Sequence, residues 1–168
     1  MLAMVAALPK SRAATDEDGA RLKAAGARCA EIARELETLV DRDTEAYNIV
    51  LAAYKLPKGA EQEKAARAAA IQDGMRAATA APLAVMRACA AAAEQGVVVA
   101  TFGLASAASD ARVGLELLGA ALRGARENVD INLGSVKDAD YVARVRRDAA
   151  ELERALVREA AAATRALA

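Results

Sequence analysis

Three polar residues interrupt stripes of apolar residues that otherwise recur at helical spacing: Asp43, Asp110 and Asn128. An unpaired carboxylate among apolar groups costs several kcal/mol, or its pKa shifts until it is neutral. Asp43 could therefore lie where its helix leaves the core, fix the register of buried helices, or line a cavity that binds a polar ligand. The spacing alone leaves these three interpretations open.

Residues close to Asp43 strengthen the cavity interpretation. Tyr47 follows Asp43 by four positions and shares its helical face, and Asp41 lies within the same two turns. Lys55 and Lys58 flank the break LPKG, where a turn can present amines to an anionic ligand. Such a set could hold a heterocycle through carboxylate hydrogen bonds and an acidic tail through lysine, although each lysine could equally be a solvated surface charge.

The composition narrows the chemistry open to these residues. The chain has no histidine, and its two cysteines, Cys29 and Cys89, lie far apart on apolar stripes, where we expect buried inert thiols. Metals with nitrogen and sulfur ligands are therefore not expected, and neither is Ser-His-Asp or Cys-His catalysis. Acid–base chemistry would have to use carboxylates, lysine or tyrosine.

Charge and hydropathy restrict the partners that we expect. Lysine plus arginine equals aspartate plus glutamate, at 23 each, so the formal net charge is zero. A nucleic-acid binder or a polybasic membrane anchor should instead show a basic excess. The N-terminal MLAMVAALPK has too short an apolar run for a signal peptide, and no later segment is predicted to span a bilayer. We expect a cytoplasmic protein without nucleic-acid or membrane partners.

The elements that position these residues are predicted to be helices of one domain, residues 1–168. The chain is 55% hydrophobic but only 2% aromatic, which favours closely packed helices over sheets. Pro9 ends a first short helix. Thr15 is a candidate N-cap, with Asp18 at capping-box spacing, for a second helix that continues to Lys55 over about 60 Å.

The later helices are predicted from prolines and caps. A third helix covers about 60–78, and a fourth starts at Pro82, which suits a first turn, and reaches about Phe102. Ser106 is the candidate N-cap of a fifth helix that ends near Asn132. A sixth helix follows the turn LGSVKD. The fold class is therefore an all-α bundle with one or two very long helices.

The length of these helices predicts a homodimer. Helices longer than the rest of a small domain usually need a partner. In addition, the apolar stripe of the predicted fifth helix contains Gly114, Ala121 and Gly124, and such small side chains imply a neighbouring helix at close range.

Three segments resemble the cyclodeaminase/cyclohydrolase family: DRDTEAYNIVLAAYKLPK, EKAARAAAIQDGMRAATAAPLAVMRAC and SDARVGLELLGAALRGARENVDINLGSVKD. This family includes the C-terminal domain of formiminotransferase-cyclodeaminase and stand-alone methenyltetrahydrofolate cyclohydrolases. The likeness extends from Met1 to about Tyr141. No single motif is specific to the family, but their combination is. The motifs are an acid pair, an aromatic residue, LPK, a proline-started helix and SD…RGA…N…INL.

The resemblance implies an all-α dimer that hydrolyses 5,10-methenyltetrahydrofolate to 10-formyltetrahydrofolate, or cyclises 5-formiminotetrahydrofolate with loss of ammonia. Cyclohydrolysis is favoured because no fused transferase domain is seen. Neither reaction needs a cofactor beyond the tetrahydrofolate substrate. By resemblance, Asp43 and Asp110 are the catalytic candidates. The candidate substrate-binding residues are Asp41, Tyr47, Asn128, Lys55 and Lys58.

Two departures from the family pattern favour an alternative. The family begins with a glycine-rich segment of PGGGS type before the first helix, and we expect this chain to start inside that helix without the segment. A polar loop resembling HGN is replaced by TFGLASAASD, with Phe102 and Leu104 at the polar positions. The alternatives are therefore a catalytically inactive folate-binding relative and a structural helical dimer or adaptor module.

Overall fold

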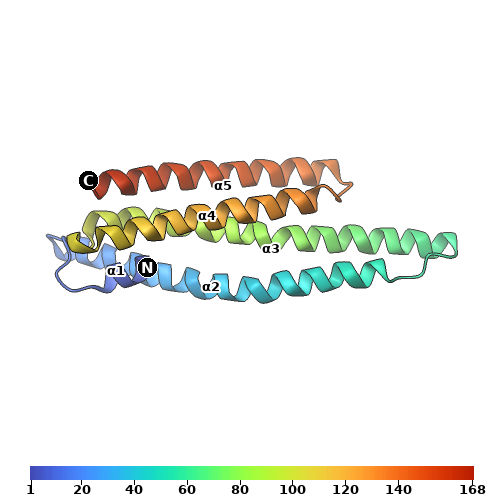
Figure 1. Cartoon of the computed structure of the whole chain (residues 1–168), viewed down its shortest axis with the longest axis horizontal. Coiled ribbons are helices and arrows are strands. Elements are labelled where there is room, and N and C mark those ends of the chain that lie inside the picture. Colours follow the sequence, from blue (N-terminus) through green and yellow to red (C-terminus); the bar gives the residue numbers. More distant parts are fainter.

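The computed structural model describes all 168 residues as five α-helices and one short 3-10 helix, without strands. The elements are α1 (Leu2–Ala7), α2 (Asp16–Tyr54), α3 (Glu61–Phe102), η1 (Ala105–Ala107), α4 (Ala108–Leu133) and α5 (Ala139–Ala166). The predicted all-α class is confirmed, with two very long helices of 39 and 42 residues. Figure 1 shows α2 to α5 running side by side along the length of the molecule.

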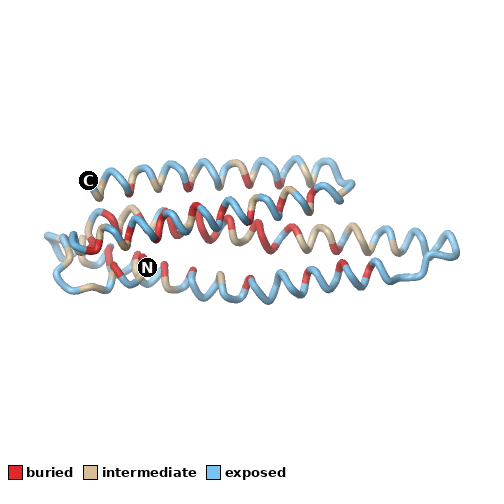
Figure 2. Tube along the Cα trace, viewed as in Figure 1, coloured by how far each residue is buried: buried red, intermediate tan, exposed pale blue.

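Helix α3 is the centre of the bundle, because α2, α4 and α5 each pack along it. One core cluster joins α3, α4 and α5 around Met86, Leu122 and Val145. A second cluster, around Val5 and Leu22, joins α1 and α2 to α3 and α4. The end of the α2–α3 hairpin extends beyond the turn between α4 and α5 (Figure 1), and Figure 2 shows this end largely exposed.

The start of α2 agrees with its predicted cap. The side-chain oxygen of Thr15 accepts a hydrogen bond from the main-chain N–H of Asp18 at 3.1 Å. Acidic residues also fill the first turn, where the helix dipole favours negative charge. Local sequence therefore specifies the helix that carries Asp43.

The predicted break before Pro82 is wrong, because α3 continues through this proline. Proline has no N–H, so the carbonyl of Ala78, four residues earlier, loses its helical donor. The side-chain amide of Asn132 on α4 donates to that carbonyl at 2.8 Å and replaces the missing bond. One helix of 42 residues therefore takes the place of the two that were predicted.

The predicted N-cap at Ser106 is also wrong. Ser106 lies inside η1, and α4 begins at Ala108 after Ala107, which has no capping side chain. The N–H of Ala107 bonds to the carbonyl of Leu104 at 3.0 Å, so the short 3-10 turn provides the entry to the helix. The last helix does use a side-chain cap, because Asp138 accepts from the N–H of Tyr141 at 2.9 Å.

The expectation that no segment is long enough to span a bilayer is wrong for α3. Its 42 residues include a window of mean hydropathy 1.4, so that by length and composition it passes the test for a membrane span. However, 56% of that window is buried inside the protein, and a helix at the centre of a bundle passes the same test. Cys29 and Cys89 are buried free thiols, as expected.

Candidate functional site

A groove between α2 and α4, with α3 as its floor, contains both Asp43 and Asn128. Its volume is about 370 Å³, which lies within the range of small-molecule sites. We call it the α2–α4 groove. Its lining residues are Leu36, Leu39, Val40, Asp43, Thr44, Ala81, Pro82, Val85, Ala121, Gly124, Ala125 and Asn128.

Asp43 is exposed in this groove. Its carboxylate makes no hydrogen bond or ion pair within the chain. The buried register-fixing interpretation is therefore wrong, and the carboxylate is free to accept hydrogen bonds from a ligand. On the opposite wall, the amide of Asn128 donates weakly to the carbonyl of Gly124 at 3.4 Å, which leaves its side-chain oxygen free to accept another bond.

The other candidates on α2 lie outside this groove. Tyr47 follows Asp43 by one turn, and its ring is 60% exposed. Asp41 is two residues before Asp43 and therefore points about 200° away around the helix. Lys55 and Lys58 are exposed at the α2–α3 turn, and Lys55 is about 18 Å from Asp43 along the axis. The structure groups none of these four with Asn128, and their roles stay predictions.

Asp110 lies in the first turn of α4, partly exposed and without a side-chain partner. Along the same helix it is about 27 Å from Asn128 at 1.5 Å per residue. Within one chain, the structure therefore does not bring Asp110 to Asp43.

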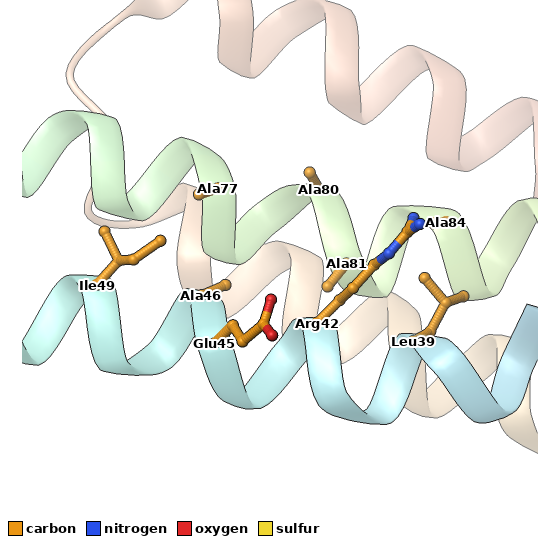
Figure 3. A pocket seen from close by; sticks show the side chains of 9 residues that line it. All are labelled: Leu39, Arg42, Glu45, Ala46, Ile49, Ala77, Ala80, Ala81 and Ala84. Atoms are coloured by element: carbon orange, nitrogen blue, oxygen red, sulfur yellow. The ribbon is translucent and has the colours of Figure 1, made fainter.

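A second groove lies on the other side of α2, with a volume of about 300 Å³. Figure 3 shows the side chains of Arg42 and Glu45 extending from α2 toward an α3 surface made of alanines. Arg42 and Glu45 are not among the site residues predicted from the sequence. The signal that could have identified them is their spacing of three residues on α2, together with the alanine stripe of α3 that they face. No polar group lies in the α3 wall, so this groove has fewer means to orient a heterocycle than the α2–α4 groove.

The two thiols do not provide a nucleophile. Burial raises the pKa of Cys89 to about 11 and also raises the pKa of Cys29. A thiol in such surroundings is neutral and inert near neutral pH. Burial likewise raises the pKa of Tyr141, whose hydroxyl donates to the carbonyl of Arg76 at 3.3 Å and joins α5 to α3. No group of three or more His, Cys, Asp or Glu side chains is placed to hold a metal ion.

The fold and the groove define an all-α protein whose long helices present a carboxylate and an amide on facing walls. Residues 1–151 match the family described as formiminotransferase-cyclodeaminase, and the chain belongs to this family. The resemblance found in the sequence is therefore confirmed.

Individual relatives agree with this assignment. The methenyltetrahydrofolate cyclohydrolase of Methylorubrum extorquens is 39% identical over 108 residues, which are 64% of this chain and 52% of that protein. The formimidoyltransferase-cyclodeaminase of Sus scrofa is 39% identical over 113 residues, which are 67% of this chain and 21% of that protein. The chain thus spans about half of the first relative and about a fifth of the second.

A solved structure supports the fold. The formiminotetrahydrofolate cyclodeaminase of Thermotoga maritima superimposes with a TM-score of 0.81, covering 99% of this chain and 79% of that one. At 24% sequence identity, this similarity shows the shared fold alone.

Proposed function

We propose that the chain is an enzyme of tetrahydrofolate one-carbon chemistry that hydrolyses 5,10-methenyltetrahydrofolate to 10-formyltetrahydrofolate in the α2–α4 groove. Membership of the family supports this proposal, and so does a relative that is named a methenyltetrahydrofolate cyclohydrolase. The observation that carries it is the free carboxylate of Asp43, exposed in a groove whose opposite wall holds Asn128.

The groove can perform the chemistry of this hydrolysis. The methenyl carbon lies between two nitrogens that share a positive charge, and an adjacent carboxylate stabilises that charge. Asp43 accepts a proton from the attacking water as the new carbon–oxygen bond forms. The bond from carbon to N5 then breaks, N5 takes up a proton, and the 10-formyl product and one net proton are released. No atom changes oxidation state, so the reaction as proposed needs no redox cofactor.

Loss of the methenyl chromophore on addition of the purified chain tests this proposal. We expect acceleration over a buffer blank, and we expect Asp43→Asn to remove most of it. A chain that binds a folate tightly by calorimetry but gives no acceleration would be an inactive folate-binding relative. A chain that neither binds nor accelerates would be a structural helical protein, and either result would contradict the proposal.

Cyclising deamination of 5-formiminotetrahydrofolate is the second candidate, because the family description and the Sus scrofa relative both carry the word cyclodeaminase. The same carboxylate would stabilise the developing amidinium while ammonia leaves. Release of ammonia from 5-formiminotetrahydrofolate, without hydrolysis of the methenyl compound, would establish this activity in place of the first.

The proposal includes a homodimer in the cytoplasm, with the folate as its small-molecule partner and without nucleic acid or membrane. The exposed small-residue face of α4 supports the dimer. Sedimentation of the purified chain measures its oligomeric state directly.

A further inference from the structure

Helices α2 and α4, the two walls of the α2–α4 groove, are positioned by α3. Both walls pack along α3, but they pack much less on one another. The distance between Asp43 on one wall and Asn128 on the other therefore depends on how each helix is seated on α3. Apolar packing is not directional, so by itself it fixes the position of a helix along its neighbour only loosely. Specific contacts are needed to fix the width of the groove.

One side chain of α3 holds the turn that follows α4. The amide nitrogen of Gln72 donates to the carbonyl of Ser135 at 3.0 Å, and its amide oxygen accepts from the N–H of Lys137 at 2.7 Å. Ser135 and Lys137 belong to the turn between α4 and α5, which Figure 1 shows beside α3. Neither main-chain group has a main-chain partner. Gln72 therefore supplies both hydrogen bonds that the turn lacks.

Two further side chains hold the end of α4 and the start of α5 on the same part of α3. Asn132 donates to the carbonyl of Ala78 at 2.8 Å, and the hydroxyl of Tyr141 donates to the carbonyl of Arg76 at 3.3 Å. With the two bonds of the turn, these contacts fall within residues 72–78, which we call the spacer segment. A hydrogen bond weakens steeply as its length and angle change. The four bonds therefore fix the axial position of α4 on α3.

The spacer segment also seats α2. Gly74 is buried, and a side-chain carbon added there would lie 3.2 Å from Cγ2 and 3.3 Å from Cα of Val50. Any larger residue would push the main chain of α2 outward by a few tenths of an ångström. Val50 follows Asp43 by seven positions, or about two helical turns, so both lie on the same face of α2. The contact at Gly74 thus sets the distance from α3 to the wall that carries Asp43.

We propose that Gln72 and Gly74 are positioning residues that set the two walls of the α2–α4 groove at the separation its chemistry needs. Neither residue lines the groove. Gly74 acts through the helix of Asp43, and Gln72 acts through the helix of Asn128. This role rests on the proposed function of the groove. A displacement of a reacting group by about 1 Å can lower a rate about 100-fold, so a small change in either contact should be visible in kcat.

Amide exchange tests the contact of Gln72 without any need for activity. Gln72→Leu keeps a side chain of similar size but loses both hydrogen bonds, so the N–H of Lys137 should exchange at least about tenfold faster. The N–H of Tyr141, which bonds to the side chain of Asp138 at the start of α5, is the internal reference and should not change. Gln95→Leu is the matched control, because Gln95 is also partly buried on α3. Unchanged exchange at Lys137 would overturn the contact.

Steady-state kinetics test the role of Gln72 in the proposed hydrolysis. Gln72→Leu should lower kcat for methenyltetrahydrofolate about tenfold or more and raise KM less than about threefold. The reason is that misplaced walls disturb the transition state more than they disturb binding of the ground state. Gln95→Leu should change neither constant. A loss that appears in KM alone would show that Gln72 affects binding and not the alignment of the reacting groups.

A methyl group at Gly74 tests the second contact. Gly74→Ala raises helix propensity, so the variant should stay folded, but the new methyl group presses on the main chain at Val50. We expect kcat to fall about tenfold while the far-UV circular dichroism stays that of the wild type. Gly19→Ala is the matched control on α2, because a side-chain carbon there meets no atom within 4 Å. The same kcat in both variants would contradict the role of Gly74.

A double-mutant cycle separates positioning from general support of the fold. If Gln72 acts through the wall that carries Asn128, then Gln72→Leu should lower kcat/KM less than about threefold in an Asn128→Ala background. A residue that only stabilises the fold would lower kcat/KM by the same factor in both backgrounds. That second result would overturn the positioning role.

The kinetic results also distinguish failure of this inference from failure of the proposed function. An active wild type, together with full activity in Gln72→Leu and Gly74→Ala, would refute the positioning role alone. A wild type that does not hydrolyse methenyltetrahydrofolate would refute the proposed function, and with it the role of both residues in that reaction, even if Lys137 exchanges faster in Gln72→Leu.

Discussion

The side-chain amide of Asn132 donates to the carbonyl of Ala78 across 2.8 Å, and Ala78 is the residue whose helical donor is lost at Pro82. This bond joins α4 to the floor of the α2–α4 groove. Pro82 lies in the lining of the groove, and Asn128 is one turn before Asn132 on α4. The contact therefore helps to set the separation between the floor and the wall that carries Asn128.

Asn132→Ala should lower the free energy of unfolding by about 1–2 kcal/mol, because it leaves a partly buried carbonyl without a partner. In a Pro82→Ala background, residue 82 regains an N–H that can donate to Ala78, so the same substitution should cost less there. Urea denaturation of the four proteins gives both costs, and their difference is the coupling. An equal cost in both backgrounds would show that the amide does not replace the proline's missing bond.

Asp43→Asn should reduce kcat/KM for methenyltetrahydrofolate about 100-fold or more, since it removes the proposed proton acceptor. The free energy of unfolding should change by less than about 0.5 kcal/mol, because the exposed carboxylate has no partner within the chain. Glu37→Gln is the matched control, because Glu37 is also an exposed carboxylate on α2 but does not line the groove. A similar loss of activity in both variants would show that the effect is not specific to the groove.

Lys55 and Lys58 should matter most for substrates with several glutamates. Lys55 is about 18 Å from Asp43 along α2, so a short substrate held at Asp43 need not reach either amine. Lys55→Gln/Lys58→Gln should therefore raise KM for a polyglutamyl substrate more than for the monoglutamate, with a larger difference at low ionic strength. Lys23→Gln, also exposed on α2, is the control. The same change in KM for both substrates would remove the lysines from the tail site.

Local signals in the sequence were enough to predict α2 and its cap, and helical spacing placed Asp43 and Asn128 on faces that meet in one groove. Spacing specifies the face of a helix but not the position along its axis. Asp110 and Asn128 share a stripe, yet five turns separate them. The prediction that α4 needs a close neighbour also came from its glycines and alanines, whereas the identity of that neighbour is not encoded in spacing.

The errors have a non-local cause. The sequence predicts that a helix starts at Pro82, because the residue that replaces the proline's missing hydrogen bond, Asn132, is fifty positions later. Ser106 is predicted to be the N-cap of the helix that follows, because the 3-10 turn that contains it has no strong sequence signal. The apolar window of α3 is rich in alanine and valine and contains few charges, a composition that serves equally well at the centre of a helical bundle and in a membrane span.

Cys89 is fully buried, and burial raises its pKa to about 11 from an ordinary value of 9.0. A raised pKa stabilises the folded chain at low pH, where the thiol is protonated in both states. As the pH rises above about 9, the unfolded chain releases this proton while the folded chain keeps it. The contribution of Cys89, at most about 2–3 kcal/mol, is therefore lost between about pH 9 and pH 11.

Cys89→Ala removes this titration while keeping the other ionisable groups, including Cys29, whose effects cancel in the comparison. Near pH 7 the variant should be less stable by about 1 kcal/mol, since it loses a packed sulfur. The difference between wild type and variant should shrink and then reverse as the pH rises toward 10.5, because only the wild type loses the contribution of a buried thiol, about 2 kcal/mol by that pH. Urea denaturation at a series of pH values measures this difference, and a constant difference would mean that Cys89 ionises as readily in the folded chain as in the unfolded one.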